Sequence, residues 1–231
     1  MVSSKQKLLA EAVATFSLVF IGAGSVLANS FTGGGLGILG IALAHGLVLM
    51  SMVYATGHIS GGHANPAVTL SFVAARKIGL KLGIGYIIFQ LIGAGIAGYL
   101  LSYIFSSSPA SLALGATQLA SGITMEMGIL IEAVLTFFLV FTVFGVAVDK
   151  RAPQGMAGLA IGLVLAFDIL VGGGLTGAAM NPARSFGPSL AASFWNNHFV
   201  YWIGPLIGGI VAGLIYKFGF LKGTEVQKTL G

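Results

Sequence analysis

Long apolar runs alternate with short polar segments along this chain, and most runs have the length of a bilayer-crossing helix. A hydrocarbon core of about 30 Å needs about 20 apolar residues at a rise of about 1.5 Å each. On this basis the pattern predicts six spans, with a polar, small-residue loop at Ser106–Ile123 between the third and the fourth. The predicted spans are Leu8–Ala28, Leu36–Thr56, Leu82–Phe105, Gly128–Val148, Met156–Val171 and Phe199–Phe218.

Two further apolar stretches, Asn65–Ala75 and Asn181–Ala192, are too short to cross a bilayer. About ten helical residues cover about 15 Å, which is half of the hydrocarbon core. Each stretch begins with asparagine, a preferred N-cap residue, followed by a proline (Pro66, Pro182) that suits the first helical position. We therefore predict two half-helices that start in the middle of the membrane, each after a loop that dips inward.

The two halves of the chain repeat each other. Residues 8–20 and 129–141 are identical at nine of thirteen positions. Each half has three predicted spans, an odd number, so the second half is inserted upside down and the half-helices meet near the midplane. Short, interrupted segments at matching places in such inverted repeats point to a transport path. We predict an all-α membrane protein with one channel domain over residues 1–231, made of repeats at about 1–120 and 121–231.

Composition and charge narrow the class of protein. The chain is 56% hydrophobic and 7% charged, whereas about a quarter of the residues in a soluble domain are charged. It has no cysteine, which excludes disulfides and thiolate metal sites. The basic residues outside the apolar core all fall on one side of the predicted spans, so they place both termini in the cytoplasm and argue against a nucleic-acid partner. These residues are Lys5, Lys7, Arg76, Lys77, Lys81, Lys150, Arg151, Lys217, Lys222 and Lys228.

The meeting point of the half-helices is the candidate site. Each helix N-terminus carries about half a positive charge, and Asn65 and Asn181 can cap their helices with the amide oxygen while the NH₂ group faces a lumen. Such a centre offers donors but no acceptors, which breaks a proton wire and repels cations. The preceding backbone carbonyls would form a ladder of acceptors that leads small neutral solutes to the centre, with no metal or cofactor. The ladder residues are Gly61, Gly62, His63, Ala64, Gly177, Ala178, Ala179 and Met180.

Together, the two Asn-Pro-Ala boxes (completed by Ala67 and Ala183), the Gly57–His63 segment and the Asn181–Pro188 segment resemble the aquaporins of the major intrinsic protein family over essentially the whole chain. The resemblance implies an aquaporin-like right-handed helical bundle in a lipid bilayer. It also implies a homotetramer with a separate pore in each subunit.

The family also supplies expected filter positions. Arg184 follows the second box, His45 lies twenty residues before the first asparagine, and Ile169 and Ala178 lie twelve and three before the second. This set resembles the plant tonoplast intrinsic proteins, and the resemblance implies a filter wider than that of a strict water channel. Water would then be accompanied by ammonia, and urea or hydrogen peroxide become candidates.

Three acidic residues lie within predicted spans or next to filter positions. Glu11 and Glu132 occupy equivalent repeat positions, where we favour anchoring of the re-entrant loops through backbone N–H groups over a proton relay. Asp168 adjoins Ile169, and we consider a pairing with His45 that would make the filter pH-sensitive. The other interpretation of Asp168 is a carboxyl group satisfied by loop backbone.

Several alternatives stay open beside the water channel. A glycerol facilitator is the minor interpretation, because Ser185 stands where facilitators usually carry aspartate. An ion-coupled secondary transporter would need a coordinating site at the midplane, where this chain has asparagines under positive helix ends. An enzyme lacks a nucleophile–base or metal constellation in the sequence, and a structural junction protein would not need Arg184. The short tails favour a multi-pass protein of the cell membrane, while the filter also fits a vacuolar membrane.

Overall fold

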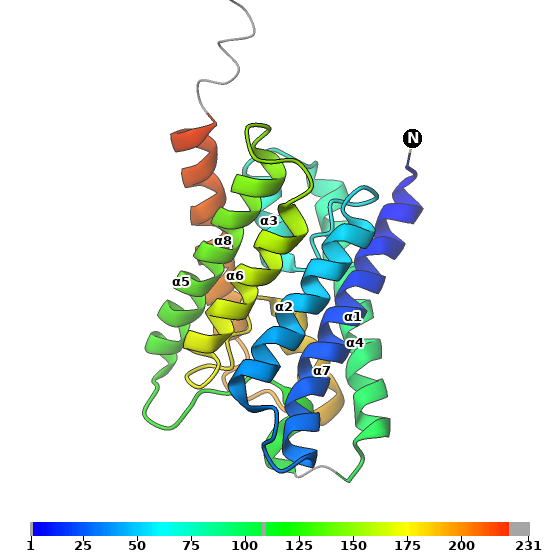
Figure 1. Ribbon diagram of the computed structural model, residues 1–231, viewed down its shortest axis with the longest axis vertical. Helices are drawn as coiled ribbons and strands as arrows, with labels where there is room; N and C mark the ends of the chain where they lie inside the picture. Colours follow the sequence, from blue (N-terminus) through cyan, green and yellow to red (C-terminus); the bar gives the residue numbers. More distant parts are fainter. Residues whose placement is uncertain (1, 108–109, 222–231) are drawn as a thin grey trace, which may run out of the picture.

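The computed structural model describes residues 2–107 and 110–221, and all the regular elements in this part of the chain are helical (Figure 1). Two of the basic residues used to predict topology, Lys222 and Lys228, lie outside the described residues. The long helices are α1 (Ser4–Phe31), α2 (Gly37–Thr56), α4 (Leu80–Ile104), α5 (Met125–Val143), α6 (Ala157–Gly172) and α8 (Val200–Ile215). The two predicted half-helices are α3 (Pro66–Ala74) and α7 (Pro182–Ala192).

The predicted spans are confirmed to within a few residues, and three short helical turns are added to them. Helices α5 and α8 each continue into a π-helical turn, Phe144–Val148 and Tyr216–Phe220. The loop between α4 and α5 contains a 3₁₀ segment, Ala110–Gly115, that the apolar pattern did not predict. Among the described residues, five helices are long and apolar enough to cross a membrane, and α6 is a shorter apolar helix of 16 residues.

Glycines let the helices pack in matched pairs. On α4, Gly93 faces the backbone of Ala12 on α1, and on α8, Gly208 faces the backbone of Ala133 on α5, with no room for a Cβ at either glycine. Close approach through small residues is the usual means of helix association in membranes, where the lipid is as apolar as the side chains. The two half-helices are held between these pairs, since α7 packs on α4 and α3 packs on α8.

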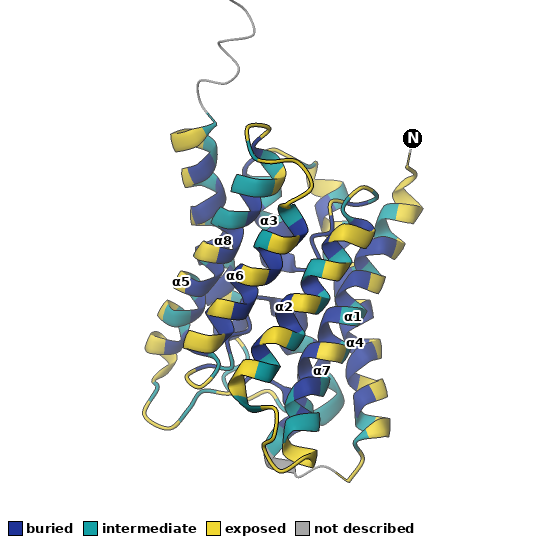
Figure 2. Ribbon diagram, viewed as in Figure 1, coloured by how far each residue is buried: buried dark blue, intermediate teal, exposed yellow. Residues whose placement is uncertain are grey.

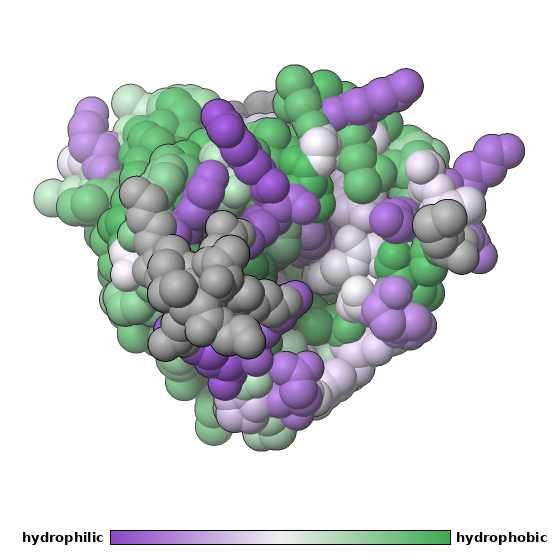
Figure 3. All heavy atoms as spheres, turned by 90° about the horizontal axis from the view of Figure 1, so that it is seen from above, coloured by the Kyte–Doolittle hydropathy of each residue, from purple (hydrophilic) through white to green (hydrophobic). Residues whose placement is uncertain are grey.

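The outside of the bundle is apolar and its two ends differ in charge. Exposed residues form stripes on the outward faces of the long helices (Figure 2), and large apolar side chains such as Leu9, Leu47, Ile96 and Phe167 are among them. The end that carries the N-terminus gathers hydrophilic side chains (Figure 3). The loops and helix ends on this side bear the described lysines and exposed arginines, including Arg76, Lys77 and Lys150. A lipid-facing belt and one basic end match a multi-pass membrane protein.

Candidate functional site

The half-helices α3 and α7 start opposite each other in the interior, each capped as the sequence predicts. Asn65 Oδ1 accepts from the N–H of Ala67 at 2.8 Å, and Asn181 Oδ1 accepts from the N–H of Ala183 at 3.0 Å. Pro66 and Pro182 each occupy the first helical position. Because the amide oxygen of each asparagine accepts from its own helix, only the N–H groups of the side chain remain for bonds to other residues or to a permeant.

The two asparagines also bond across to each other's loops. Asn65 Nδ2 donates to the carbonyl of Met180 at 2.8 Å, and Asn181 Nδ2 donates to the carbonyl of Ala64 at 2.9 Å. This finding corrects the expectation that the NH₂ groups are left entirely to the lumen. Each of these two carbonyls of the predicted acceptor ladder already accepts one hydrogen bond and keeps a second lone pair. One N–H of each amide is committed to the opposite loop, and the second is left to face the space between the helices.

The loops before the half-helices have the same unusual backbone. Three equivalent positions in each have positive φ: 101°, 63° and 48° at Gly61, Gly62 and Ala64, and 85°, 44° and 51° at Gly177, Ala178 and Met180. For residues other than glycine this region costs roughly 1–2 kcal/mol. Such strain persists only where the surroundings impose it.

Buried carboxylates impose this backbone geometry. Glu11 on α1 accepts from the N–H groups of His63 (3.0 Å) and Ala64 (2.8 Å), and Glu132 on α5 accepts from those of Ala179 (2.9 Å) and Met180 (2.7 Å). Each carboxylate also accepts from one loop hydroxyl, Ser60 or Thr176, at 2.6 Å. Both glutamates are fully buried. Their contacts are those of loop anchors, and non-helical backbone at this depth needs such partners because lipid offers none.

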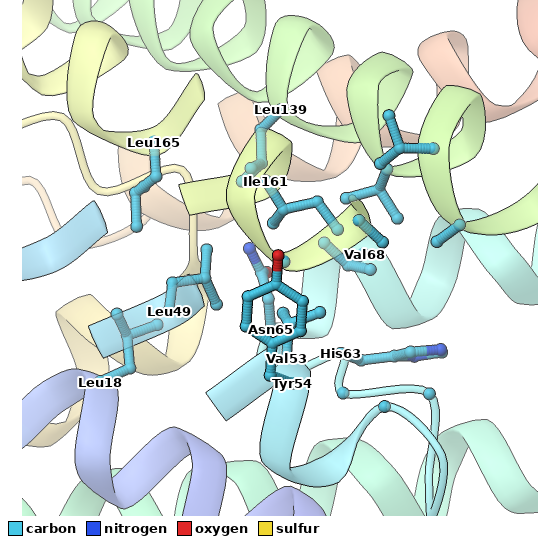
Figure 4. A pocket seen from close by; sticks show the side chains of 18 of the residues that line it. Leu18, Leu49, Val53, Tyr54, His63, Asn65, Val68, Leu139, Ile161 and Leu165 are labelled. Atoms are coloured by element: carbon cyan, nitrogen blue, oxygen red, sulfur yellow. The ribbon is translucent and has the colours of Figure 1, made fainter. Parts of the chain in front are cut away.

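A cavity of about 360 Å³ runs through the centre of the bundle and is lined by both asparagines. On α2 its lining residues include His45, Leu49 and Val53, spaced four apart on one helix face. From His45 to Gly57 the cavity follows α2 for about 18 Å, at about 1.5 Å per residue. In Figure 4 the side chains of Leu18, Leu49, Leu139, Leu165 and Val68, from five different helices, converge on the region around Asn65.

His45 and Arg184 lie at the far end of this cavity, in direct contact. Nε and one terminal nitrogen of Arg184 approach His45 Nε2 at 3.4 and 3.3 Å, while Nη1 donates to the carbonyl of Gly115 at 2.7 Å. His45 Nδ1 lies 2.9 Å from the carbonyl of Ile41. Both side chains are about 97% buried. The long loop between α4 and α5 thus supplies the acceptor that fixes the arginine.

The structure thus has two opposed half-helices capped by asparagine, a central cavity that both asparagines line, and an arginine at one end of this cavity. The sequence profile of the major intrinsic protein family matches residues 1–216. This chain belongs to the major intrinsic protein family. It is similar to Aquaporin TIP4-4 of Zea mays, with 46% identity over 219 residues, covering 92% of this chain and 86% of the relative. With Aquaporin-4 of Mus musculus it shares 40% identity over 224 residues, covering 96% and 69%.

The fold comparison agrees with the sequence comparison. The X-ray structure of the aquaglyceroporin from Plasmodium falciparum matches with a TM-score of 0.83 and 25% identity, covering 99% of this chain and 100% of that one. The family and these relatives make the protein a multi-pass membrane channel for water and small solutes, an aquaporin of the tonoplast intrinsic type.

Two predicted filter residues of this aquaporin, Ile169 and Ala178, are buried but do not line the cavity described above. Both lie near the C-terminal glycines of α6: a Cβ on Gly172 would be 3.2 Å from that of Ala178, and one on Gly173 would be 3.3 Å from Cγ2 of Ile169. The structure therefore joins His45 to Arg184 directly. Ile169 and Ala178 are related only in that both lie next to the segment Gly172–Gly173.

Asp168 does not pair with His45, which was one of the two interpretations considered for this residue. Within the described residues no hydrogen bond or ion pair joins it to His45, whose ring nitrogens face Ile41 and Arg184. Asp168 is 1% exposed, and its Oδ2 has no hydrogen-bond partner in the part of the chain that the structure describes. The alternative, a carboxyl group satisfied by loop backbone, is likewise not observed for this oxygen.

The mouth of the channel at the end that carries the N-terminus is bordered by the loop between α5 and α6. Pro153, Gln154 and Gly155 line the cavity there, and Asp149 braces the loop through its ion pair with Arg151. Hydrogen bonds from the Arg151 guanidinium hold the pKa of Asp149 well below its usual range. This contact therefore stabilises the fold above the ordinary carboxyl pKa of about 3.9, and the stabilisation is lost only as the pH falls through the depressed value.

Sequence reasoning missed several residues that hold the site together. The hydroxyl groups of Tyr86 and Tyr201 donate to the carbonyls of Ser60 and Thr176 at 2.7 and 2.8 Å. Gln90 on α4 donates to Glu11 at 2.7 Å and to Thr69 at 2.9 Å. A glutamine in the middle of an apolar span is itself a signal, because polar groups at that depth need a partner. The carbonyl of Gly115 carries no signal that side-chain chemistry could reveal.

Proposed function

We propose that this aquaporin conducts water together with ammonia, and that urea and hydrogen peroxide are further candidates, while protons and ions are excluded. The observation that carries the proposal is the contact between His45 and Arg184 at one end of a cavity that is otherwise mostly apolar and that both asparagines line. An apolar wall with few polar groups binds a small neutral solute weakly, which allows rapid passage.

Exclusion of protons and cations follows from the charges at the two narrow points. At the centre, two helix N-termini present positive ends and the asparagines present only N–H groups. A water molecule there must turn its oxygen to both of them, so it cannot pass a proton along a chain of donors and acceptors. At the constriction the Arg184 guanidinium repels cations. A coupled transporter would need a cation site at these points, and the described residues contain no cluster of three or more acidic, histidine or cysteine side chains.

The solute range follows from the filter composition. We propose that Ile169 and Ala178 complete the filter with His45 and Arg184, and that Gly61, Gly62, His63, Gly177 and Ala179 supply its backbone acceptors. With an aliphatic side chain at position 169 and a methyl group at 178, this filter offers polar groups mainly from one side. Such a filter admits small neutral molecules that accept or donate one or two hydrogen bonds.

For the whole protein we propose one channel domain of two inverted repeats that acts as a passive pore and not as an enzyme. The family resemblance supports a homotetramer with a pore in each subunit. The basic end supports cytoplasmic placement of both termini under the positive-inside rule, in the cell membrane or, in keeping with the tonoplast-type relatives, in a vacuolar membrane.

Glycerol conduction is the second candidate, favoured by the structural likeness to an aquaglyceroporin. Against it stands Ser185, which replaces the aspartate usual in facilitators and whose hydroxyl lies 2.8 Å from that of Thr117.

Stopped-flow light scattering on proteoliposomes tests the proposal. Water efflux is followed by vesicle shrinkage, ammonia entry by an internal pH dye, and glycerol entry by re-swelling. We expect fast water efflux and accelerated ammonia entry in the wild type, both lost when bulky side chains replace His45 and Ala178. Fast water efflux with unaccelerated ammonia entry would reduce the protein to a plain water channel, and fast glycerol entry would favour the facilitator. No flux of any solute would overturn the channel assignment.

A further inference from the structure

A glycine on α1 lies directly behind the imidazole of His45. Gly22 is buried, and a Cβ built on it would lie 2.5 Å from Nε2 and 2.6 Å from Cδ2 of His45. Favourable contacts between heavy atoms begin at about 3.5 Å. No side chain fits between this point of α1 and the ring, so the imidazole packs against the bare backbone of the helix.

The ring has little freedom to move aside along its own helix. Its Nδ1 lies 2.9 Å from the carbonyl of Ile41, and its Nε2 lies within 3.4 Å of two nitrogens of Arg184. His45 lines the central cavity, whereas Gly22 does not. A group added on α1 behind the ring would therefore displace it toward the cavity and toward Arg184.

We propose that Gly22 is a positioning residue of the constriction, which by lacking a side chain keeps His45 back against α1 and sets the width of the path beside Arg184. The inference rests on the proposed function and deepens it by naming what admits neutral solutes wider than water, such as urea. Pore diameter and the groups that line it determine selectivity at such a point. Gly22 thus acts on the permeant only through His45.

A second glycine on the same helix provides a matched control. A Cβ on Gly24, two residues further along α1, would meet only Cδ2 of Leu101 on α4, at 3.2 Å. Gly22→Ala and Gly24→Ala add the same methyl group to the same helix, and both favour helix propensity equally. Any general effect on α1 therefore appears in both variants, whereas a displacement of His45 appears only in the first.

The test compares wild type, G22A, G24A, H45A and the double variant G22A/H45A in proteoliposomes that contain equal amounts of assembled protein. We expect G22A to lower urea entry roughly tenfold and water efflux roughly threefold, since the wider solute is more sensitive to pore diameter. G24A should conduct as the wild type does. G22A/H45A should match H45A for both solutes, because the ring that the methyl group displaces is gone.

Two results would overturn the inference. In the first, G22A conducts water and urea as fast as the wild type does. In the second, adding G22A to H45A lowers the fluxes by the same factor as adding G22A to the wild type. If G22A does not assemble, the double variant decides, since it should assemble and conduct like H45A, and its failure would mark Gly22 as a packing residue only. If wild type passes water but not urea, the proposed solute range is wrong, and the water fluxes of the same proteins still decide the role of Gly22. A wild-type protein that conducts neither water nor urea would contradict the proposed function and also this inference.

Discussion

The two re-entrant loops share one anchoring scheme but present different side chains to the channel. In each, a buried glutamate accepts from two loop N–H groups and one hydroxyl, and a tyrosine hydroxyl donates to a loop carbonyl. The loop before α3 then presents His63, whose Nδ1 lies 3.1 Å from Thr69 Oγ1. The loop before α7 has Ala179 at the equivalent position and leads to Arg184. The anchoring scheme is the same in both loops while the side chains differ, so an imidazole-bearing loop and an arginine-bearing segment can be placed at opposite ends of one channel.

A second difference concerns the residue that α4 places beside Glu11 and the residue at the corresponding position of α8. Glu11 has an additional neighbour, Gln90, whose Nε2 donates to it and whose Oε1 is buried without a partner among the described residues. The corresponding residue on α8 is Pro205, one position before the matching Leu-Ile-Gly stretch. Glu11 therefore has beside it a polar amide with an unused oxygen, and Glu132 has a proline at the corresponding place.

Replacing each anchor by glutamine should break the symmetry most strongly. In Glu132→Gln the new NH₂ group faces an N–H donor of the loop, which leaves a buried donor unpaired at a cost of about 1–3 kcal/mol. In Glu11→Gln the new NH₂ group also faces a loop N–H, but the amide of Gln90 can rotate and offer its oxygen to it, so that fewer buried donors are left unpaired than in Glu132→Gln. We expect Glu132→Gln to lower the Tm of the detergent-solubilised protein by roughly 5–10 °C and Glu11→Gln by less than half of that.

Differential scanning fluorimetry on both variants, with water efflux per assembled channel, measures this difference. Equal losses at the two sites would mean that Gln90 does not compensate. A larger loss in Glu11→Gln would reverse the comparison.

Exchanging glycine and alanine at the equivalent positions Gly62 and Ala178, both of which have positive φ, should destabilise the protein only in the first case. A Cβ on Gly62 would lie 3.2 Å from Thr56 Oγ1 and 3.3 Å from Cα of Val53, and its φ is 63°. Gly62→Ala should therefore lower the Tm, with a conformational cost of about 1–2 kcal/mol. Ala178→Gly relieves a residue at φ 44° and should leave the Tm unchanged or raise it by about 1–2 °C, because the unfolded chain also gains freedom. Thermal melts of Gly62→Ala and Ala178→Gly measure the two shifts in Tm. A lower Tm in both variants would show that the loop before α7 tolerates no extra backbone freedom.

Removing the two tyrosine hydroxyl groups should give small and equal effects. Each donates one hydrogen bond to one loop carbonyl, worth about 1 kcal/mol, so Tyr86→Phe and Tyr201→Phe should each lower the Tm by about 2–4 °C. The double variant should lose the sum, since the sites are in separate loops. A markedly larger effect at one tyrosine would locate an asymmetry that the hydrogen-bond distances do not reveal.

The smallest expected effect is that of Asp168→Asn on pH dependence. No hydrogen bond or ion pair joins Asp168 to His45 within the described residues, so the profile of water and ammonia flux against pH should be the same in the variant and the wild type. Flux measurements from pH 5 to 8 in matched proteoliposomes provide the check, with His45→Ala as the positive control for loss of the filter histidine. A flattened profile in Asp168→Asn would restore the pairing that the structure does not show.

The sequence was sufficient to predict the elements of this fold because each depends on local signals. The spans follow from apolar length, the half-helices from Asn-Pro at their starts, and the inverted arrangement from the repeat around Glu11 and Glu132. The anchoring role of these glutamates, preferred over a proton relay, matches their hydrogen bonds. What could not be predicted depends on contacts between distant segments, such as the hydrogen bond from Arg184 to the carbonyl of Gly115.

Two hypotheses about the site differed from the structure, one about a side chain and one about backbone carbonyls. The position of Asp168 beside Ile169 suggested an approach to His45, but successive residues of a helix point about 100° apart and need not face one space. The carbonyls of Ala64 and Met180 were predicted to face the permeant, but each also accepts from the opposite asparagine. Backbone direction within an irregular loop is set by its partners, which the local sequence does not name.

The crossed bonds between Asn65 and Met180 and between Asn181 and Ala64 join residues that are 115 and 117 positions apart. Neither half of the chain can make them until the other half has been inserted, and closing so long a loop is entropically unfavourable before such contacts exist. The centre of the channel can therefore be completed only after both halves of the chain are in place. A half-inserted intermediate lacks both crossed bonds, and with them the facing pair of half-helix starts that the finished channel has.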